Sequence, residues 1–534
     1  MNRSRYVPPI ALITLLAASC AGTQRPAPPT PQAIADAAAQ PTPPPKAATP
    51  PADPDALPSV HDLCLEDPDA VLMSSGEMIA PPTELQSVSD RLDAVDSDGG
   101  DPFVVVHYGD SHTKAASLPR ELRDLFGGGP ASPGFIAPGH PAPGLWDASV
   151  SHSGAWTRHN WLYGRDRPSF GPMGLAYSTR APGARLRLKL RTAPARGDRA
   201  RVTIFYKHEA GHLPFRVESG GEVLAEVESA QEPVDDFELG LVEVELPVGA
   251  RDMGLTVGGQ RGGGGEFRFY GALVQYPDAV IEWDAMGIGG TTIRGPVRRS
   301  DHTMDTYLNW RDPDMLVFWY GSNSAAEINL NVERYGEEFD TMLARMRDAA
   351  PNAACLVIGL PDLDRPTGSC AARSKRGRSK PRRSGRRTRR VKEPRAQARG
   401  SDNGRINLMA PRRDPVENPI RPAAPRASCE YQTVRPLPGM VEVQRAAAER
   451  NGCIYFDTYN YMGGWNSIRA WANQKPALAS RDMVHLTRTG YRTLARAIFE
   501  KLSVLIKDLE QQRALGLCPE PNRPAEVSMS EWTE

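Results

Sequence analysis

The amino-acid sequence of 534 residues predicts an α/β fold, in which a three-layer α/β/α domain carries an inserted all-β sandwich. Apolar runs of strand length alternate with amphipathic runs of helix length, which indicates parallel strands joined by crossover helices. One stretch breaks this alternation with short period-two runs separated by Gly, Pro and Asp-rich turns, which indicates antiparallel sheets. We therefore expect two folded units in one chain.

Apolar periodicity predicts the elements of the α/β part. Because Pro119 suits only the first turn of a helix, the helix at 117–126 must start beside it, and the residues before it form a separate short turn. The closing helix repeats apolar residues on one face, namely Leu494, Ile498, Leu502 and Leu505. The predicted strands are 104–108, 315–320, 353–360 and 453–459, and the predicted helices are 117–126, 333–347, 441–450 and 487–509.

Residues 185–190 read Arg-Leu-Arg-Leu-Lys-Leu, an alternation typical of a strand with one solvent-exposed face and one buried face. Further short strands are predicted at 202–206, 215–218, 223–227, 241–246, 253–257 and 267–274. Three aromatic side chains, Trp156, Trp161 and Tyr163, accompany them. They would stack on a sugar ring if exposed, but buried aromatic residues are more common.

An apolar strand at 104–108 leads directly into Gly109-Asp110-Ser111. The glycine permits a tight exit, which leaves Ser111 at the carboxyl edge of a parallel sheet, where ligands bind. Ser111 is therefore a candidate nucleophile. Taken alone, such a tripeptide is more often an ordinary turn.

A second pattern, Asp482-x-x-His485, precedes the closing helix. In a loop that enters a helix, this spacing places both side chains on one side of the chain, so that Asp482 orients His485 and His485 takes the proton of Ser111. The alternative is a plain helix start, with Asp482 or Thr487 as the N-cap and His485 as a packing residue.

Two further positions supply hydrogen-bond donors. Gly290 lies in the glycine-rich turn after residue 287, and Asn323 follows the strand at 315–320. The backbone N–H groups of Ser111 and Gly290, together with the Asn323 amide, would form an oxyanion hole. Each position alone also fits a plain turn or a strand-end cap.

These residues follow one another in the order Ser, Gly, Asn and Asp-x-x-His, and in this the chain resembles the SGNH hydrolases, also called the GDSL family. The resemblance implies that Ser111 is the nucleophile, that Gly290 and Asn323 stabilise the oxyanion, and that Asp482 and His485 complete the triad. Two positions depart from the family pattern. Ser324 stands where an acidic residue is usual, and His112 stands where leucine is usual. We interpret His112 as a solvated residue of the first helical turn.

A narrower resemblance is to the periplasmic peptidoglycan O-acetylesterases and related O-acetyltransferases. It rests on the block Gly-Asp-Ser-His-Thr-Lys followed by 122–129, on the β-rich insertion, and on the tail Val-His-Leu-Thr-x-x-Gly-Tyr at 484–491. In those enzymes the insertion is a jelly roll similar to carbohydrate-binding modules. The resemblance implies a flavodoxin-like SGNH domain with an inserted jelly-roll sandwich.

The first twenty residues predict export. Arg3 and Arg5 precede an apolar stretch too short to span a bilayer, and the stretch ends at Cys20. This pattern resembles a bacterial lipoprotein signal with Cys20 as the lipidated residue; the alternative is an ordinary secretory signal. We expect a periplasmic protein that is anchored by lipid to a bacterial membrane, and of the bacterial membranes we favour the outer one.

The predicted organisation divides the chain into five parts. These are a signal at 1–20, a Pro/Ala-rich tether at 21–58, the first part of the SGNH domain at 59–150, the β-sandwich at 151–280 and the second part of the SGNH domain at 281–534. A tether of this composition has no capacity to pack a core.

Six cysteines remain besides Cys20, and in an exported protein they can form disulfides. Cys370 and Cys429 bracket an irregular insert and are our preferred pair, followed by Cys64 with Cys518. We interpret Cys355 and Cys453, on predicted core strands, as packed thiols. No cysteine or histidine spacing resembles a zinc site, and we expect neither metal nor cofactor.

The bracketed insert at 371–428 carries 19 lysines and arginines against 4 acidic residues, although the whole chain has 64 of each charge. It lacks apolar periodicity, so we predict disorder. Attachment to anionic envelope polymer or lipid suits an exported protein better than nucleic-acid binding, since interleaved aromatic residues are absent. A solvated loop without a partner is the alternative.

The sequence thus predicts a serine esterase that removes O-acetyl groups from cell-wall glycan, peptidoglycan above all, through an acyl-enzyme. An O-acetyltransferase acting on envelope polysaccharide would use the same residues, because only the acceptor differs. A non-catalytic envelope glycan-binding protein is the third alternative, and the full set of catalytic residue types argues against it.

Overall fold

The computed structural model describes residues 72–96, 101–127, 131–138, 147–162, 169–195, 197–230, 239–259, 264–298, 302–327, 329–366 and 430–515. Several predictions fall outside these ranges: the signal with Cys20, the tether, the basic insert, Tyr163 and the pairs Cys370–Cys429 and Cys64–Cys518. Among the described residues, no helix is both long and apolar enough to cross a membrane.

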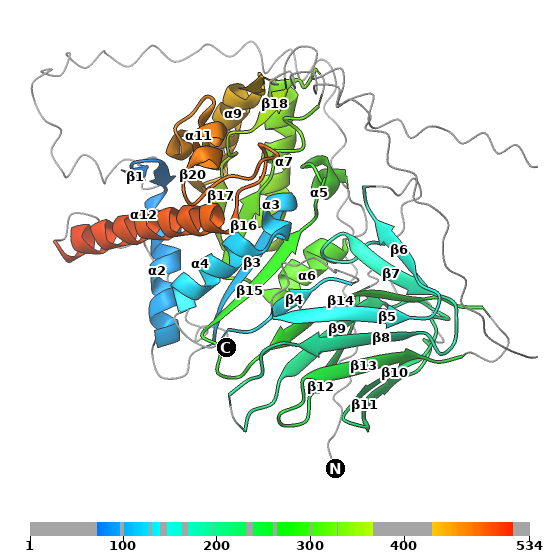
Figure 1. Ribbon diagram of the computed structural model, residues 1–534. Coiled ribbons are helices and arrows are strands. Elements are labelled where there is room, and N and C mark those ends of the chain that lie inside the picture. The colour runs from blue at the N-terminus through cyan, green and yellow to red at the C-terminus, as the bar shows by residue number, and fades with distance from the viewer. Residues whose placement is uncertain are drawn as a thin grey trace, which may run out of the picture. The chain divides into compact units, whose positions relative to one another are not determined.

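A seven-stranded sheet forms the centre of the α/β part, in the order β1-β2-β20-β17-β16-β3-β15 (Figure 1). The five strands from β20 to β15 are parallel, whereas β2 and β1 continue the sheet antiparallel. Four of the five match strands that the sequence predicts, and β15 is the one that it does not predict. The strands β1 and β2 have three residues each, too few to show a period. The bounds are β1 (Met73–Ser75), β2 (Met78–Ala80), β3 (Phe103–Gly109), β15 (Ile281–Gly287), β16 (Met315–Trp319), β17 (Ala354–Ile358) and β20 (Ile454–Phe456).

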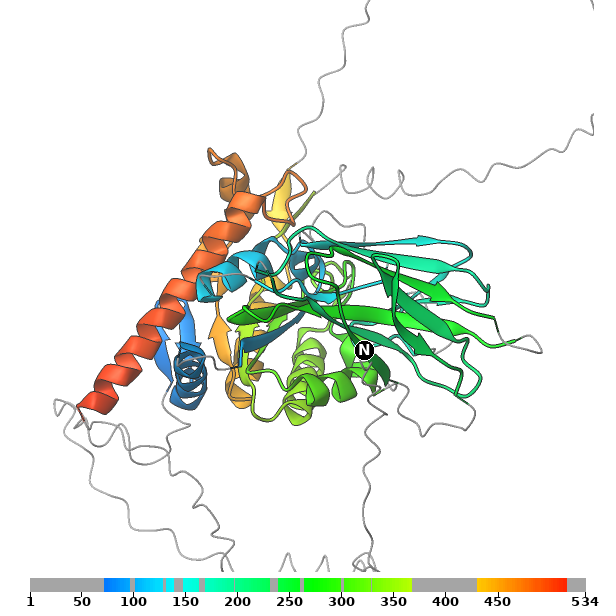
Figure 2. The ribbon, with the colours of Figure 1, turned by 90° about the horizontal axis from the view of Figure 1, so that it is seen from below.

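Helices cover both faces of this sheet and make three layers (Figure 1 and Figure 2). Val106 and Tyr108 of β3 share one core with α6, α7 and α9, while Phe103 and Val105 share the opposite core with α2, α4 and α12. The bounds are α2 (Pro82–Asp96), α3 (Ser111–Lys114), α4 (Ser117–Gly127), α5 (Arg294–Arg298), α6 (Thr303–Arg311), α7 (Val332–Ala349), α9 (Leu437–Arg450), α10 (Thr458–Met462), α11 (Ser467–Asn473) and α12 (Arg488–Ala514).

The inserted sandwich consists of two antiparallel sheets, ordered β11-β10-β13-β8-β5 and β12-β9-β14-β7-β6, with β4 paired to β14. All seven strands predicted in this stretch are present. The bounds are β4 (Gly134–Ile136), β5 (Ala148–Ser153), β6 (Thr157–Asn160), β7 (Leu175–Thr179), β8 (Arg185–Leu190), β9 (Arg201–Lys207), β10 (Phe215–Ser219), β11 (Glu222–Val227), β12 (Leu239–Glu245), β13 (Asp252–Val257) and β14 (Phe267–Gln275).

The predicted start of the sandwich at residue 151 is wrong, because β4 and β5 already belong to its sheets. The strand β5 reads Ala-Ser-Val-Ser-His-Ser and is largely exposed, so its sequence has no apolar alternation that would predict a strand. The antiparallel pair β18 (Asp364–Pro366) and β19 (Tyr431–Thr433) forms a small sheet of its own.

Cys355 and Cys453 form a disulfide, so their interpretation as packed thiols is wrong. Cys355 lies on β17, and Cys453 directly precedes β20, the parallel neighbour of β17. This pairing brings their Cα atoms to 4.6 Å, although 98 residues separate them in sequence. Because both predicted strands were assigned to the same core, only their order in the sheet could have revealed the bond.

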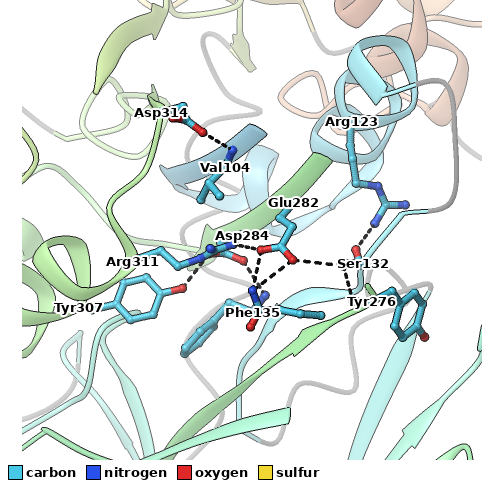
Figure 3. Close-up of polar contacts among 11 residues, drawn as sticks. Val104, Arg123, Ser132, Phe135, Tyr276, Glu282, Asp284, Tyr307, Arg311 and Asp314 are labelled. Atoms are coloured by element: carbon cyan, nitrogen blue, oxygen red, sulfur yellow. Dashed lines mark hydrogen bonds and ion pairs between the residues drawn. The ribbon is translucent and has the colours of Figure 1, made fainter. Parts of the chain in front are cut away.

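Two buried carboxylates on β15, Glu282 and Asp284, meet one buried cation, Arg311, at the end of α6 (Figure 3). Arg311 donates from Nε to Asp284 over 2.9 Å and from Nη2 to Glu282 over 2.6 Å. Tyr307, one turn earlier, donates its hydroxyl to Asp284 over 2.7 Å. Burial alone would lower the pKa of Arg311, but the two carboxylates outweigh it and raise that pKa.

The same carboxylates hold segments of the sandwich. Asp284 accepts the backbone N–H of Phe135 on β4 over 2.9 Å, and Glu282 accepts the amide of Gln275 on β14 over 2.9 Å. Phe205 and Leu239, from the sandwich strands β9 and β12, belong to the same apolar core as α6. The sandwich and the central sheet are thus joined by apolar contacts and by hydrogen bonds to buried carboxylates.

Replacing Arg311 tests this junction. Arg311→Met should lower the free energy of unfolding by about 3–5 kcal/mol, because it leaves buried carboxylates without their cation. The control is Arg187→Met, which breaks the exposed pair with Asp252 and should change it by less than about 1 kcal/mol. Urea unfolding at neutral pH measures both variants, and an equal effect of the two would contradict the role given to Arg311.

Candidate functional site

Three strand ends place the candidate site. Gly109, the last residue of β3, pairs with Gly287 at the end of β15 and with Trp319 at the end of β16. The strands are parallel, so the loops that follow them leave the same edge of the sheet at the same level. A Cβ on Gly287 would stand 2.1 Å from the backbone nitrogen of Lys114, so glycine is needed for α3 to pack there.

Ser111, His485 and Asp482 form a continuous hydrogen-bonded chain. Ser111 Oγ lies 2.8 Å from His485 Nε2, and His485 Nδ1 lies 2.7 Å from Asp482 Oδ2. The two ring nitrogens of His485 thus face a hydroxyl on one side and a carboxylate on the other. This is the arrangement in which a histidine accepts a serine proton while the carboxylate stabilises the imidazolium.

The loop before α12 fixes the acid–histidine pair. Asp482 Oδ1 accepts the backbone N–H groups of His485 over 3.0 Å and Val484 over 3.1 Å. Partial burial alone would raise the pKa of Asp482, but these bonds and the one from the His485 ring outweigh it and lower that pKa. Thr487, not Asp482, caps α12, by accepting the N–H of Gly490 over 3.1 Å.

Helix packing fixes Ser111 against His485. Ser111 begins the one-turn helix α3, which is separate from α4, as the position of Pro119 predicts. α4 in turn packs against α12, where Glu121 pairs with Arg492 over 3.2 Å and with Arg496 over 3.5 Å. The two helices that adjoin the serine and the histidine are therefore held to each other.

Gly290 and Asn323 lie in the loops that follow β15 and β16. Gly290 has φ +88°, a conformation that favours glycine. None of the described residues accepts a hydrogen bond from the backbone N–H of Ser111 or of Gly290. Asn323 Nδ2 donates to Thr291 O over 2.9 Å and, less closely, to Asp110 Oδ2 over 3.3 Å. Asn323 is thereby tied to the turn that contains Gly290.

Two similarities to known proteins cover large parts of this chain. Residues 254–498 match the family model "GDSL-like Lipase/Acylhydrolase", a range that contains Gly290, Asn323, Asp482 and His485. A solved structure described as "Peptidoglycan O-acetylesterase in action, 5 min" is 18% identical, covers 80% of this chain and 96% of its own, and has a TM-score of 0.53. The chain contains a GDSL/SGNH hydrolase domain. Ser111 precedes the matched range and is assigned to the site by its geometry.

Other solved structures are less similar to this chain. "Crystal Structure of TesA" is 12% identical over 42% of this chain and 78% of its own, with a TM-score of 0.23. The C-terminal CBM6 of LamC from Zobellia galactanivorans is 13% identical over 23% of this chain and 99% of its own, with a TM-score of 0.16. Similarity this low establishes no shared fold. No curated protein matches the chain.

Asp110, which sequence reasoning left without a role, organises the serine turn of the GDSL/SGNH domain. It is fully buried, and its carboxylate accepts the N–H of His112 over 3.0 Å and the N–H of Ser322. Burial raises the pKa of Asp110 to about 7, although these bonds and the nearby His485 act against the rise. Its position inside the Gly-Asp-Ser tripeptide was the available signal.

The interpretation of His112 as solvated is wrong, because the side chain is fully buried. Its ring lies 4.8 Å from Trp319 and 5.2 Å from His485, between ring centroids, and Nδ1 shares a 3.0 Å hydrogen bond with the hydroxyl of Tyr491. Burial, helped by His485, lowers the pKa of His112 to about 3. The neutral ring of His112, which itself contacts Trp319 and Tyr491, therefore lies next to the ring of His485.

The sandwich reaches the site through the end of β6. Leu162 Cδ1 lies 3.6 Å from the point where a Cβ would stand on Gly290, and the Trp161 ring packs under Gly295. Trp156 is half-buried and lies farther along the sandwich, with its ring 6.2 Å from Phe267. Of the two predicted stacking residues that the structure describes, Trp161 is therefore the one near the turn that contains Gly290.

The pKa of Asp110 gives a pH-dependent stability. The folded protein keeps this proton between about pH 4 and pH 7, where the unfolded chain has lost it, so the stability contributed by Asp110 falls as pH rises across this window. Relative to Asp110→Asn, which has no proton to lose, the parent should lose up to about 4 kcal/mol of unfolding free energy.

Chemical unfolding at a series of pH values measures this difference. Asp93→Asn, an exposed carboxyl on α2, is the control. A parent-minus-variant difference for Asp110 that stays flat from pH 4 to pH 7, as the control should, would contradict the raised pKa.

Proposed function

We propose that this GDSL/SGNH protein is a serine esterase that removes O-acetyl groups from cell-wall glycan. The observation that carries the proposal is the unbroken chain from Ser111 Oγ through His485 to Asp482, with distances of 2.8 and 2.7 Å. It lies at the strand edge that also presents Gly290 and Asn323.

The first half of the reaction acylates Ser111. Ser111 Oγ attacks the acetyl carbonyl carbon while its proton passes to His485 Nε2, and the carbonyl oxygen becomes an oxyanion. The N–H groups of Ser111 and Gly290 stabilise that oxyanion, and Asn323 joins them by exchanging its longer bond, to Asp110, for one to the oxyanion. The intermediate then collapses, and the sugar oxygen leaves with the proton from His485.

The second half restores the enzyme. Water attacks the acetyl-Ser111 carbonyl while His485 accepts one of its protons, and the new intermediate releases acetate as the proton returns to Ser111 Oγ. Asp482 stabilises the imidazolium in both halves, and its lowered pKa keeps it ionised through neutral and mildly acidic conditions. A sugar hydroxyl in place of water would give acetyl transfer.

The choice of glycan is supported by the architecture. The similar structure described as a peptidoglycan O-acetylesterase covers 80% of this chain and 96% of its own length. In the described part of the chain, β6 of the sandwich ends beside Gly290, so the inserted domain adjoins the place where a polymer would enter.

We further propose that the protein is an exported lipoprotein of the periplasm, anchored through Cys20, whose basic insert at 371–428 contacts anionic envelope polymers. The buried Cys355–Cys453 disulfide supports export, because such bonds persist in oxidising compartments. Cys20→Ser should remove the lipid from the mature protein and release it from the membrane fraction. Mass spectrometry of the amino-terminal peptide checks the first effect, and an unmodified parent would contradict the anchor.

The esterase activity is tested with the full-length protein in detergent. Ser111→Ala should lower kcat/KM for 4-nitrophenyl acetate, and acetate release from O-acetylated peptidoglycan, by about 10³-fold or more. Ser117→Ala is the matched control, since this serine begins α4 and donates only to the Ala115 carbonyl.

Three outcomes are informative. Equal activity of the parent and Ser111→Ala would refute the nucleophile. Hydrolysis of the small ester without release from acetylated glycan would refute the substrate. Acetate transfer to an added unacetylated glycan, in excess over release to water, would identify a transferase.

A further inference from the structure

Two basic side chains at the site take no part in the mechanism above. Lys114 ends α3, three residues after the nucleophile, and Arg158 lies on β6 of the sandwich. The point where a Cβ would stand on Gly289 is 3.7 Å from Lys114 Nζ and 3.8 Å from Ser111 Cβ. The Lys114 ammonium therefore lies beside the nucleophile, along the turn that leads to Gly290.

Arg158 belongs to the inserted domain, on the strand whose end lies near Gly290. On β6, His159 points inward and its Nε2 lies 2.7 Å from Ser178 Oγ, whereas its neighbour Arg158 is exposed. Two residues after β6 ends, Leu162 reaches Gly290. The charge of Arg158 is near enough to Lys114 to lower the pKa of that lysine, together with the larger effect of partial burial.

Neither cation has a counter-ion in the described part of the chain. Every ion pair found there that joins a lysine or arginine to a carboxylate involves other residues, and nearby Asp110 is engaged by backbone N–H groups and Asn323. Two like charges held close together, one of them half-buried, repel each other. An anion placed between them relieves that repulsion and gains a charge-assisted hydrogen bond from each.

We propose that Lys114 and Arg158 bind a carboxylate of the substrate, so that the esterase prefers acetyl esters on acidic glycan. This inference rests on the proposed function and names its substrate class. Lys114 comes from the catalytic domain and Arg158 from the sandwich, so the subsite exists only where the two domains meet. The sandwich thereby supplies a specificity residue to the reaction.

The carboxylate has two chemical sources, a uronic acid in the sugar chain or an acidic peptide attached to it. Both present the same anion, and the basic pair recognises the anion itself. A neutral acetylated polymer lacks it and depends on the acetyl-binding groups alone.

The test measures inhibition of 4-nitrophenyl acetate turnover by unacetylated ligands, with the full-length protein. The ligands are oligogalacturonate, a neutral xylo-oligosaccharide, and peptidoglycan fragments with free or amidated peptide carboxylates. The variant pair is Lys114→Met and Arg158→Gln, alone and combined. Lys189→Met and Arg185→Gln, on the exposed face of β8, are matched controls.

In the parent and the controls, an acidic ligand should inhibit more tightly than the neutral one, and added salt should weaken only the acidic ligand. The combined variant should raise Ki for the acidic ligand by about 10-fold or more and leave the acidic-to-neutral ratio near one. Whichever acidic ligand shows the effect, oligogalacturonate or free-carboxylate fragment, identifies the source.

Equal changes in Ki for acidic and neutral ligands would overturn the inference, because they would indicate a general disturbance of the site. No preference for acidic ligands in the parent would overturn it as well. Failure of the proposed function looks different, since it appears as absence of acetate release from acetylated glycan whatever the inhibition constants are.

Discussion

The burial of two carboxylates on one strand is the constraint on which the rest of the structure depends. Glu282 and Asp284 are removed from water in the middle of β15, a state that is costly unless a cation and hydrogen-bond donors surround them. Arg311 supplies the charge, and the sandwich supplies donors from β4 and β14. Because β15 continues to Gly287, the same strand that anchors the inserted domain also leads into the turn of Gly289 and Gly290 beside Ser111.

Sequence predicts this fold well wherever an element buries a regular face. Four of the five central parallel strands and the strand at 185–190 are found where the sequence predicts them, since apolar residues recur along them with the period of their secondary structure. The fifth, β15, contains Glu282 and Asp284, which interrupt its apolar run, and it is not predicted. The prediction fails for features that depend on tertiary contacts and have no regular apolar pattern in the sequence. The polar strand β5 and the three-residue edge strands give no pattern, and the Cys355–Cys453 bond depends on strand order, which composition does not encode.

For the site, the sequence order of Ser111, Gly290, Asn323 and Asp482-x-x-His485 is enough to predict that these residues converge. The parallel register of β3, β15 and β16 explains this convergence, because the residues that follow their carboxyl ends all lie at one edge of the sheet. The surroundings are less predictable. His112 sits next to Ser111 in sequence, yet its burial results from Trp319 and from Tyr491, which lies 379 residues away. Such long-range packing leaves no trace in a local pattern.

The Cys355–Cys453 bond also has a topological meaning. It closes a covalent ring between two cysteines that are 98 positions apart in sequence, and the basic insert lies within that ring. A protease that cuts at any of the many arginines of the insert would therefore open the ring without dividing the molecule. The two fragments would stay joined as one particle and would part on a gel only after reduction. Cleavage in the insert would thus leave the strand that leads to Ser111 covalently joined to the helix that follows His485.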